Sequence, residues 1–95
     1  MLWVGVGLVE IMRMSEIQQK EVINICDGTR LGFVCDIEIN SKTGCIQKLI
    51  VPAKGKIFGI FGREQEYHIC WNDIKCIGED LILICVNIDD IVVDL

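Results

Sequence analysis

The stretch Arg30-Leu31-Gly32-Phe33-Val34-Cys35-Asp36-Ile37-Glu38-Ile39-Asn40 decides the fold. Its apolar members recur at every second position, and the residues between them are mostly polar or small. A period of two predicts a β-strand with one buried face and one face toward water. Turn residues lie on both sides, because Asp27-Gly28-Thr29 precedes the stretch and a turn ending at Gly44 follows it. The sequence therefore predicts one long strand joined by tight turns to its neighbours.

Outward from this strand, further strand-like runs occur at 21–26, 45–52, 66–71, 75–77, 81–86 and 91–95. The continuous apolar run 81–86 predicts a fully buried strand. Pro52 cannot donate a backbone hydrogen bond, so it should end its strand or lie at an edge. Ser15 and Gln18 suggest a capped helical turn at 16–19, and no longer helix is indicated. The pattern predicts an all-β fold of five to seven short strands, in a small barrel or a sandwich. Closure is favoured because it removes exposed edges.

The composition fits one small domain that does no recognisable chemistry. The 95 residues are 52% apolar and include six cysteines, without a Cys-x-x-Cys pair and with only one histidine, His68. We expect no metal and no cofactor, and we expect reduced cysteines that fill core positions in a cytoplasmic protein rather than a disulfide framework. The apolar run 2–9 lacks the flanks of a signal peptide and is too short for a transmembrane helix. We expect residues 1–11 to be an N-terminal extension, with Met12 as a candidate natural start, and 12–95 to form the domain.

Several motifs then resemble a known family. They are Met12-Arg13-Met14-Ser15-Glu16-Ile17, Glu21-Val22-Ile23-Asn24 before Asp27-Gly28 and Leu31-Gly32, the glycine–phenylalanine pattern of 55–62, Tyr67-x-Ile69-x-Trp71-x-x-Ile74, and Ile77-Gly78-Glu79-Asp80-Leu81-Ile82-Leu83. Together they resemble PRC-barrel proteins, in particular the small YlmC/YmxH-type sporulation proteins. The family usually has a proline before the tryptophan, where this chain has Cys70. The resemblance implies a PRC-type β-barrel of about six short antiparallel strands. It also implies a non-enzymatic role, because PRC barrels in the photosynthetic reaction-centre H subunit and in a ribosome-maturation factor lie at protein–protein contacts.

The segment 54–63 is the candidate contact surface. It is apolar and rich in glycine, and it contains two of the three phenylalanines of the chain. Its glycines match neither a phosphate-binding loop nor a dinucleotide fingerprint. The segment either covers one end of the barrel or binds a partner protein, which is unknown and could be a second copy in a homodimer. Aromatic side chains beside basic ones are typical of such contacts. The candidate partner-binding residues are Lys54, Lys56, Ile57, Phe58, Ile60, Phe61 and Arg63.

An alternative follows from the distribution of charge. Between 41 and 63 there are five basic residues and no acidic ones, namely Lys42, Lys48, Lys54, Lys56 and Arg63. This basic segment, 42–63, could bind RNA or another anionic surface. The net charge of −5 argues against a nucleic-acid-coating protein. No catalytic residues are indicated, because His68 lacks a recognisable nucleophile or triad partner.

Overall fold

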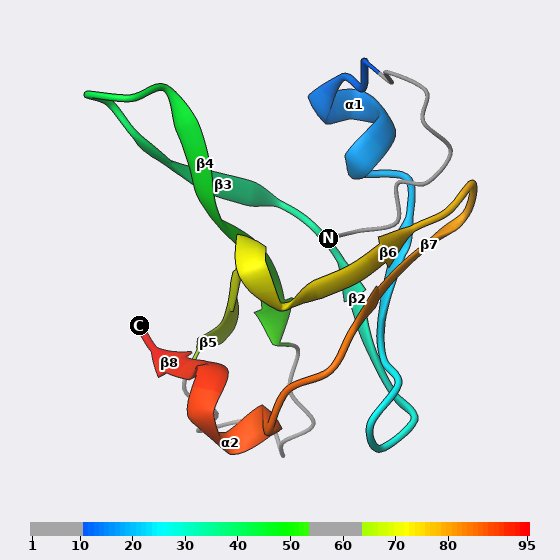
Figure 1. Cartoon of the computed structure of the whole chain (residues 1–95). Helices are drawn as coiled ribbons and strands as arrows, with labels where there is room; N and C mark the ends of the chain where they lie inside the picture. Colours follow the sequence, from blue (N-terminus) through cyan, green and yellow to red (C-terminus); the bar gives the residue numbers. More distant parts are fainter. Residues whose placement is uncertain (1–10, 54–63) are drawn as a thin grey trace.

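The structure is a computed structural model that describes residues 11–53 and 64–95. Eight strands occur in these ranges: β1 Glu21–Asn24, β2 Thr29–Phe33, β3 Asp36–Asn40, β4 Cys45–Ala53, β5 Gln65–Cys70, β6 Ile74–Ile77, β7 Leu81–Ile84 and β8 Val92–Asp94. The helical elements are short: α1 Met14–Ile17, the 3₁₀ turn η3 Trp71–Asp73 and α2 Ile88–Ile91. The prediction of a small all-β fold is confirmed (Figure 1).

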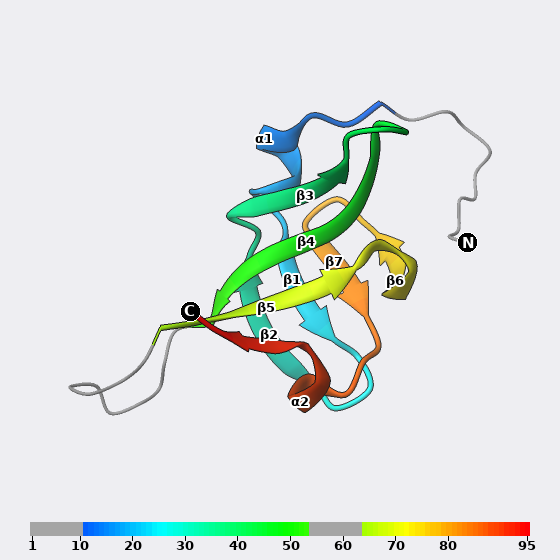
Figure 2. The same cartoon turned by 90° about the vertical axis from the view of Figure 1, so that its left-hand side faces the viewer.

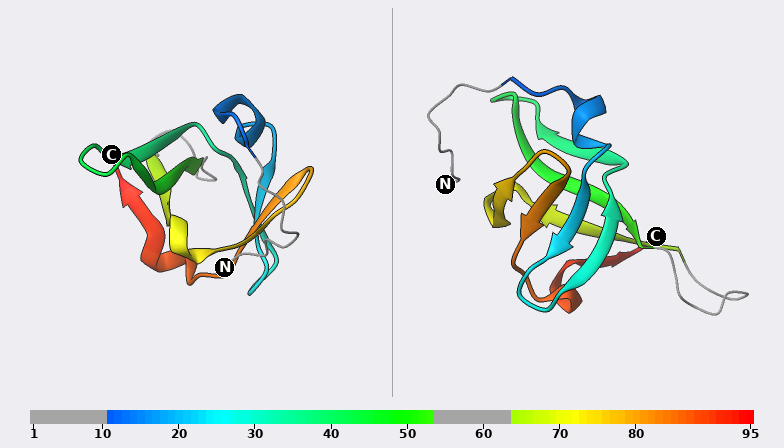
Figure 3. Two further views of the ribbon diagram at one scale, coloured as in Figure 1. Left: turned by 45° about the horizontal axis from the view of Figure 1, so that its top comes forward. Right: turned by 90° about the vertical axis from the view of Figure 1, so that its right-hand side faces the viewer.

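The strands form two four-stranded sheets rather than one closed barrel. Sheet A has the order β2-β1-β7-β6, and sheet B has the order β3-β4-β5-β8. Figure 2 shows sheet B facing the viewer, and the right-hand view of Figure 3 shows sheet A. The pairs are antiparallel except for β1 and β7, which run parallel in continuous register from Glu21 opposite Leu81 to Asn24 opposite Ile84.

The predicted long strand 30–40 is two strands in two sheets. β2 belongs to sheet A and β3 to sheet B, and between them Cys35 N–H donates to the Ile50 carbonyl at 2.8 Å. Gly32 has a φ of 119°, and the pairing of β1 with β2 shifts register between Val22 and Ile23. The alternation therefore changes phase, and Val34 is buried, whereas Phe33 is 49% exposed. The prediction that Phe33 and Cys35 share a buried face with Leu31 is wrong.

The core lies between the two sheets. Its largest fully buried apolar side chains are Leu49, Ile69, Ile82, Ile84, Val22 and Val51, which come from both sheets. Full burial of each such side chain contributes roughly 1.5–3 kcal/mol, so this layer is the main favourable term for the fold. The run 81–86 is not fully buried as predicted. Leu81 is 38% exposed, because β7 alternates between the core and the outer face of sheet A.

The ends of the elements agree in part with the sequence predictions. Gly28 and Gly44 both have a φ of 78°, as expected for glycines in tight turns. Pro52 lies opposite Glu66, one residue before the end of the pairing between β4 and β5. It is beyond the residues of β4 that pair with β3. The helical turn α1 begins at Met14. Its N-cap residue is Arg13, whose backbone N–H donates to Glu16 Oε1 at 2.7 Å, so the predicted Ser15–Gln18 cap is wrong. None of the helices in 11–53 and 64–95 is long and apolar enough to cross a membrane.

Candidate functional site

The predicted contact residues lie outside the part of the chain that the structure describes. These residues are Lys54, Lys56, Ile57, Phe58, Ile60, Phe61 and Arg63. The structure does describe the two strands that carry the segment. Ala53 at the end of β4 pairs with Gln65 at the start of β5, in an antiparallel register that continues to Lys48 opposite Cys70. A ladder of six residue pairs between β4 and β5, in the middle of sheet B, thus lies next to the candidate segment in the sequence.

The paired strands β4 and β5 next to Ala53 and Gln65 are called the stem below, and the C-terminal strand strengthens it. β8 pairs with β5 from Gln65 opposite Asp94 to Tyr67 opposite Val92. Gln65 Nε2 donates to Asp94 Oδ1 at 2.8 Å, and Leu95 N–H donates to the Glu64 carbonyl at 3.0 Å. Figure 2 shows the C-terminus beside the start of β5. The sequence indicated a strand at 91–95 but contained no signal for its partner.

The carboxylates of Glu64 and Asp94 lie at the same end of sheet B, because Leu95 bonds to Glu64 and Asp94 pairs with Gln65. Both residues are exposed. The stem is therefore acidic where the segment 54–63 is basic in sequence. Attraction between such charges is modest at an exposed surface and is screened by salt.

Of the basic residues in 42–63, the structure describes Lys42 and Lys48. Lys42 lies in the turn that precedes β4, whereas Ala53 ends that strand. A strand rises ~3.3 Å per residue, so the two ends of β4 are roughly 26 Å apart. Lys48 is half-buried in the middle of β4.

A shallow groove lies at the Lys42 end of sheet B. Its volume is about 490 Å³, and its lining includes Lys48, Cys70, Trp71 and Asn72. Trp71 lines this groove and is 36% exposed. The groove offers an indole face, an amine, amides and the thiols of Cys45 and Cys70.

The single histidine is engaged locally. His68 Nε2 lies 3.0 Å from Glu66 Oε1, and both side chains are partly buried in β5. At Cys35, desolvation, followed by the negative charges of Glu66 and Asp36, raises the pKa of the thiol. The thiol therefore stays protonated at neutral pH and is a poor nucleophile. Within 11–53 and 64–95, no three potential metal-ligating side chains of His, Cys, Asp or Glu come together.

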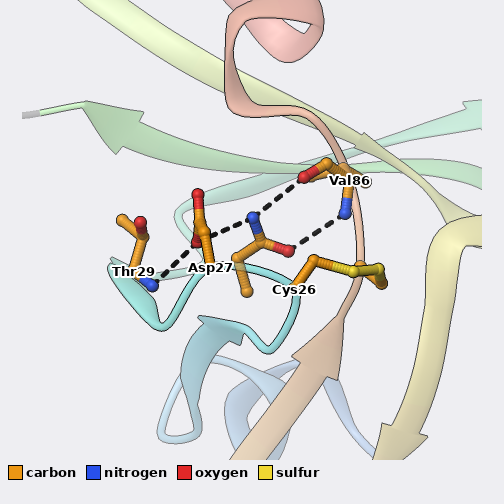
Figure 4. Close-up of a disulfide and its surroundings, with 6 residues drawn as sticks. Cys26, Asp27, Thr29 and Val86 are labelled. Atoms are coloured by element: carbon orange, nitrogen blue, oxygen red, sulfur yellow. Dashed lines mark hydrogen bonds between the residues drawn. A yellow bond between two sulfur atoms is a disulfide. The ribbon is translucent and has the colours of Figure 1, made fainter.

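A second cluster joins the ends of β1 and β7. Asn24 is fully buried, its Nδ2 donates to the Val86 carbonyl at 2.9 Å, and its Oδ1 accepts from Val86 N–H at 3.0 Å. Nδ2 also donates to Asp27 Oδ1 at 3.0 Å, and the same oxygen accepts from Thr29 N–H at 2.9 Å (Figure 4). All of the donors of this buried amide are satisfied, as buried polar groups require.

The cysteines differ from the prediction of reduced core residues. Cys26 and Cys85 form a disulfide with their Cα atoms 5.0 Å apart (Figure 4). Cys35, Cys45 and Cys70 are free and exposed, and Cys76 is free and half-buried. The sequence could not indicate the pair because it did not reveal that β1 and β7 are neighbours. The signal that was available is weak: each cysteine lies at or near the carboxyl end of a strand-like run, 21–26 for Cys26 and 81–86 for Cys85.

Comparison with known proteins agrees with this architecture. The family model described as "PRC-barrel domain" matches residues 10–94. The chain is 46% identical over 74 residues to a "Probable sporulation protein YlmC" of Bacillus subtilis, a match that covers 78% of this chain and 91% of the relative. It is 36% identical over 77 residues to an "Uncharacterized protein YmxH" of the same organism, with 79% and 89% covered. A Clostridium acetobutylicum protein is 35% identical over 81 residues, with 85% and 90% covered. The chain belongs to the PRC-barrel domain family and is similar to the YlmC and YmxH proteins.

Proposed function

We propose that this chain is a non-enzymatic protein-interaction module that contacts its partner through residues 54–63. The observation that carries the proposal is the stem described above. The pairing of the two strands that carry the segment continues to the end of β4 at Ala53 and the start of β5 at Gln65. β8 pairs with β5 on its other side. A contact segment mounted on a rigid ladder loses less conformational freedom when it binds than one mounted on flexible chain.

The chemistry of the segment indicates the kind of partner. Phe58 and Phe61 supply apolar area, and Lys54, Lys56 and Arg63 supply positive charge around it. Aromatic anchors with a basic rim fit a protein surface that has an apolar pocket edged by carboxylates. A second copy of this chain is one such candidate, because Glu64 and Asp94 are exposed beside the stem.

The names of the relatives indicate a biological process but no biochemical mechanism. The printed name of the Bacillus subtilis YlmC protein describes it as a probable sporulation protein. We extend that association to this chain and place its action in the cytoplasm. The four free cysteines, three of them exposed, support a compartment in which thiols remain reduced.

The decisive experiment compares partner capture by two matched variants. In the first, Phe58→Ser and Phe61→Ser are combined. In the second, Ile39→Ser changes an apolar residue that is 53% exposed on β3, away from the stem. Both proteins are checked for folding and then used for cross-linked capture from sporulating cells, and their self-association is measured by sedimentation. The proposal expects the first variant alone to lose the partner or the dimer. Equal capture and equal self-association by wild type and both variants would refute it.

The same proteins test the alternative that the basic segment 42–63 binds RNA or an anionic surface. The observation in its favour is the absence of acidic residues from 41 to 63. Binding through phosphates weakens steeply as salt concentration rises, whereas an apolar contact does not. A strong salt dependence of binding to single-stranded RNA or to anionic vesicles, unaffected by the phenylalanine changes, would replace the protein-contact proposal by this alternative.

A further inference from the structure

The disulfide between Cys26 and Cys85 is placed at a junction of the fold. Cys26 follows β1 by two residues, and Cys85 directly follows β7. The two strands are parallel and in register up to Asn24 and Ile84, and Ile25 N–H donates to the Ile84 carbonyl at 2.8 Å. The strand ladder itself therefore brings the two cysteines to the Cα separation of 5.0 Å, well within the range that a disulfide requires.

This bond is accessible to reagents in solution. Cys26 is exposed in the turn between β1 and β2, and Cys85 is half-buried. Exposed disulfides exchange with thiols, because the attacking thiolate can reach one of the two sulfur atoms. Of the two residues, Cys26 is the more exposed.

The state of the other cysteines indicates the redox environment. Four of them are free, and three of these are exposed to solvent. Exposed free thiols are characteristic of proteins in reducing compartments, where a disulfide is usually transient and has a catalytic or sensing role. A single closed pair among free thiols thus fits a reversible site better than a permanent structural cross-link.

The disulfide constrains the start of the segment in which the chain passes from β7 in sheet A to β8 in sheet B. After Cys85 the chain leaves β7, forms α2 and ends in β8, which pairs with β5 over only three residue pairs. Two ties hold the start of this crossing: the disulfide, and the hydrogen bonds between Asn24 and Val86. Reduction removes the first tie and leaves the second.

We propose that Cys26 and Cys85 form a reversible thiol–disulfide site, which exchanges with small thiols or dithiols and whose reduction loosens residues 87–95. In the reducing step an external thiolate attacks the Sγ of Cys26, a mixed disulfide forms, and the sulfur of Cys85 leaves as a thiolate. A second thiolate then attacks the external sulfur, so Cys26 is released and one external disulfide is produced. Two electrons pass from the two thiols to the protein disulfide, and protonation completes both cysteine thiols.

Reoxidation follows the reverse path with an external disulfide as oxidant. The β1–β7 ladder and the Asn24–Val86 bonds keep the two thiols close, so the bond re-forms within the folded domain. This inference does not depend on the proposed contact through 54–63, because it concerns other residues and has its own readouts.

The test uses the whole chain in glutathione buffers of graded redox ratio. Differential alkylation followed by peptide mass spectrometry reports each cysteine separately. We expect Cys26 and Cys85 to become reduced together, in a single two-electron step in the native protein, while Cys35, Cys45 and Cys70 are alkylated throughout. If Cys26 and Cys85 are alkylated under the most oxidising conditions, or resist reduction until denaturant is added, the proposal is wrong.

The structural consequence is tested by hydrogen exchange of the reduced and oxidised wild type. Amides in β8 should exchange roughly tenfold faster after reduction, because local opening requires less free energy. Amides in β4 that exchange only through global unfolding report the change in overall stability, and they are compared separately from those in β8. The variants Cys26→Ser and Cys85→Ser should each match the reduced wild type, and the control Cys70→Ser should match the oxidised one. If the variants do not fold, the reduced wild type still decides, and equal β8 exchange in its two redox states would refute the loosening.

Discussion

The side chain of Asn24 pairs with the backbone of Val86 as an adjacent strand would. Its amide donates to the Val86 carbonyl and accepts from the Val86 N–H, at 2.9 and 3.0 Å. Val86 lies two residues past the end of β7, where the backbone ladder with β1 has stopped. The buried amide thus continues the pairing by one step and fixes the direction in which the chain leaves sheet A.

Replacement of Asn24 by Ala should destabilise the domain by about 2–4 kcal/mol, because it leaves the Val86 N–H and carbonyl without these partners and removes a donor to Asp27. Urea unfolding followed by circular dichroism measures the change. The matched control is Asn72→Ala, which alters an exposed asparagine in η3 and should change stability by less than about 0.5 kcal/mol.

Asn24→Asp refines this prediction. Aspartate keeps the shape and the acceptor, but it cannot donate to the Val86 carbonyl and it places a charge beside Asp27. We expect this variant to be at least as unstable as Asn24→Ala near neutral pH, and to recover on acidification as the new carboxyl is protonated. Stability equal to wild type for either variant would contradict the role assigned to the amide.

The disulfide should contribute strongly to thermodynamic stability. It closes a loop with a sequence separation of 59 residues. In the loop-closure model a ring of this size stabilises the folded state by about 4 kcal/mol, through the lost freedom of the unfolded chain. Thermal unfolding with and without dithiothreitol measures the effect. We expect a large drop in Tm for wild type on reduction and none for Cys26→Ser, whereas Cys70→Ser should behave as wild type. A reductant-independent Tm for wild type would show that the bond contributes little.

The sequence predicted the local features of this fold well, because they depend on neighbouring residues. The turns at Gly28 and Gly44 are where the sequence placed them, with the positive φ that glycine permits. Most strands were predicted to within about two residues, as expected for element boundaries.

What the sequence did not contain is the long-range arrangement. The parallel pairing of β1 with β7 joins segments about sixty residues apart, and with it the contacts Asn24–Val86 and Cys26–Cys85. No local pattern encodes which strands become neighbours. The break in the strand 30–40 was also missed, since Gly32 fits an alternating pattern as well as any small residue. The proposed contact segment 54–63 stays a prediction, and only its stem is described.

Gly32 offers a test of the phase change between β2 and β3. Its φ of 119° lies beyond the left-handed region that asparagine tolerates, so any side chain here strains the backbone. A Cβ would meet only Val51 Cγ1 at 3.6 Å, which is ordinary contact, so strain and not crowding should dominate. Gly32→Ala should cost about 1–3 kcal/mol in urea unfolding.

The comparison variant is Gly44→Asn, at a φ of 78° with open space around its Cα, where the loss should be below about 1 kcal/mol. If the two variants lose equal stability, the conformation of Gly32 is not what separates β2 from β3.

The carboxylate of Asp27 should make the stability of this junction depend on pH. The backbone N–H of Thr29, the largest cause, and further hydrogen bonds from Thr29 and Asn24 hold the pKa of Asp27 below its ordinary value. Since the folded-state pKa is the lower one, the stabilisation is fully present above the unfolded pKa of about 3.9 and is lost as the pH falls through the folded value.

Asp27→Asn should therefore be less stable than wild type near neutral pH. The difference in stability should shrink below about pH 4 and vanish once Asp27 of the wild type is fully protonated, because the side chain is then uncharged in both proteins. Urea midpoints measured from about pH 6 to about pH 2 give the two curves. Asp80→Asn serves as the control, because Asp80 is an exposed turn residue whose side chain makes no hydrogen bond to the residues that the structure describes. Its curve should run parallel to that of wild type. If the Asp27→Asn curve does so as well, the Thr29 and Asn24 hydrogen bonds do not discriminate between the two forms of the carboxyl group.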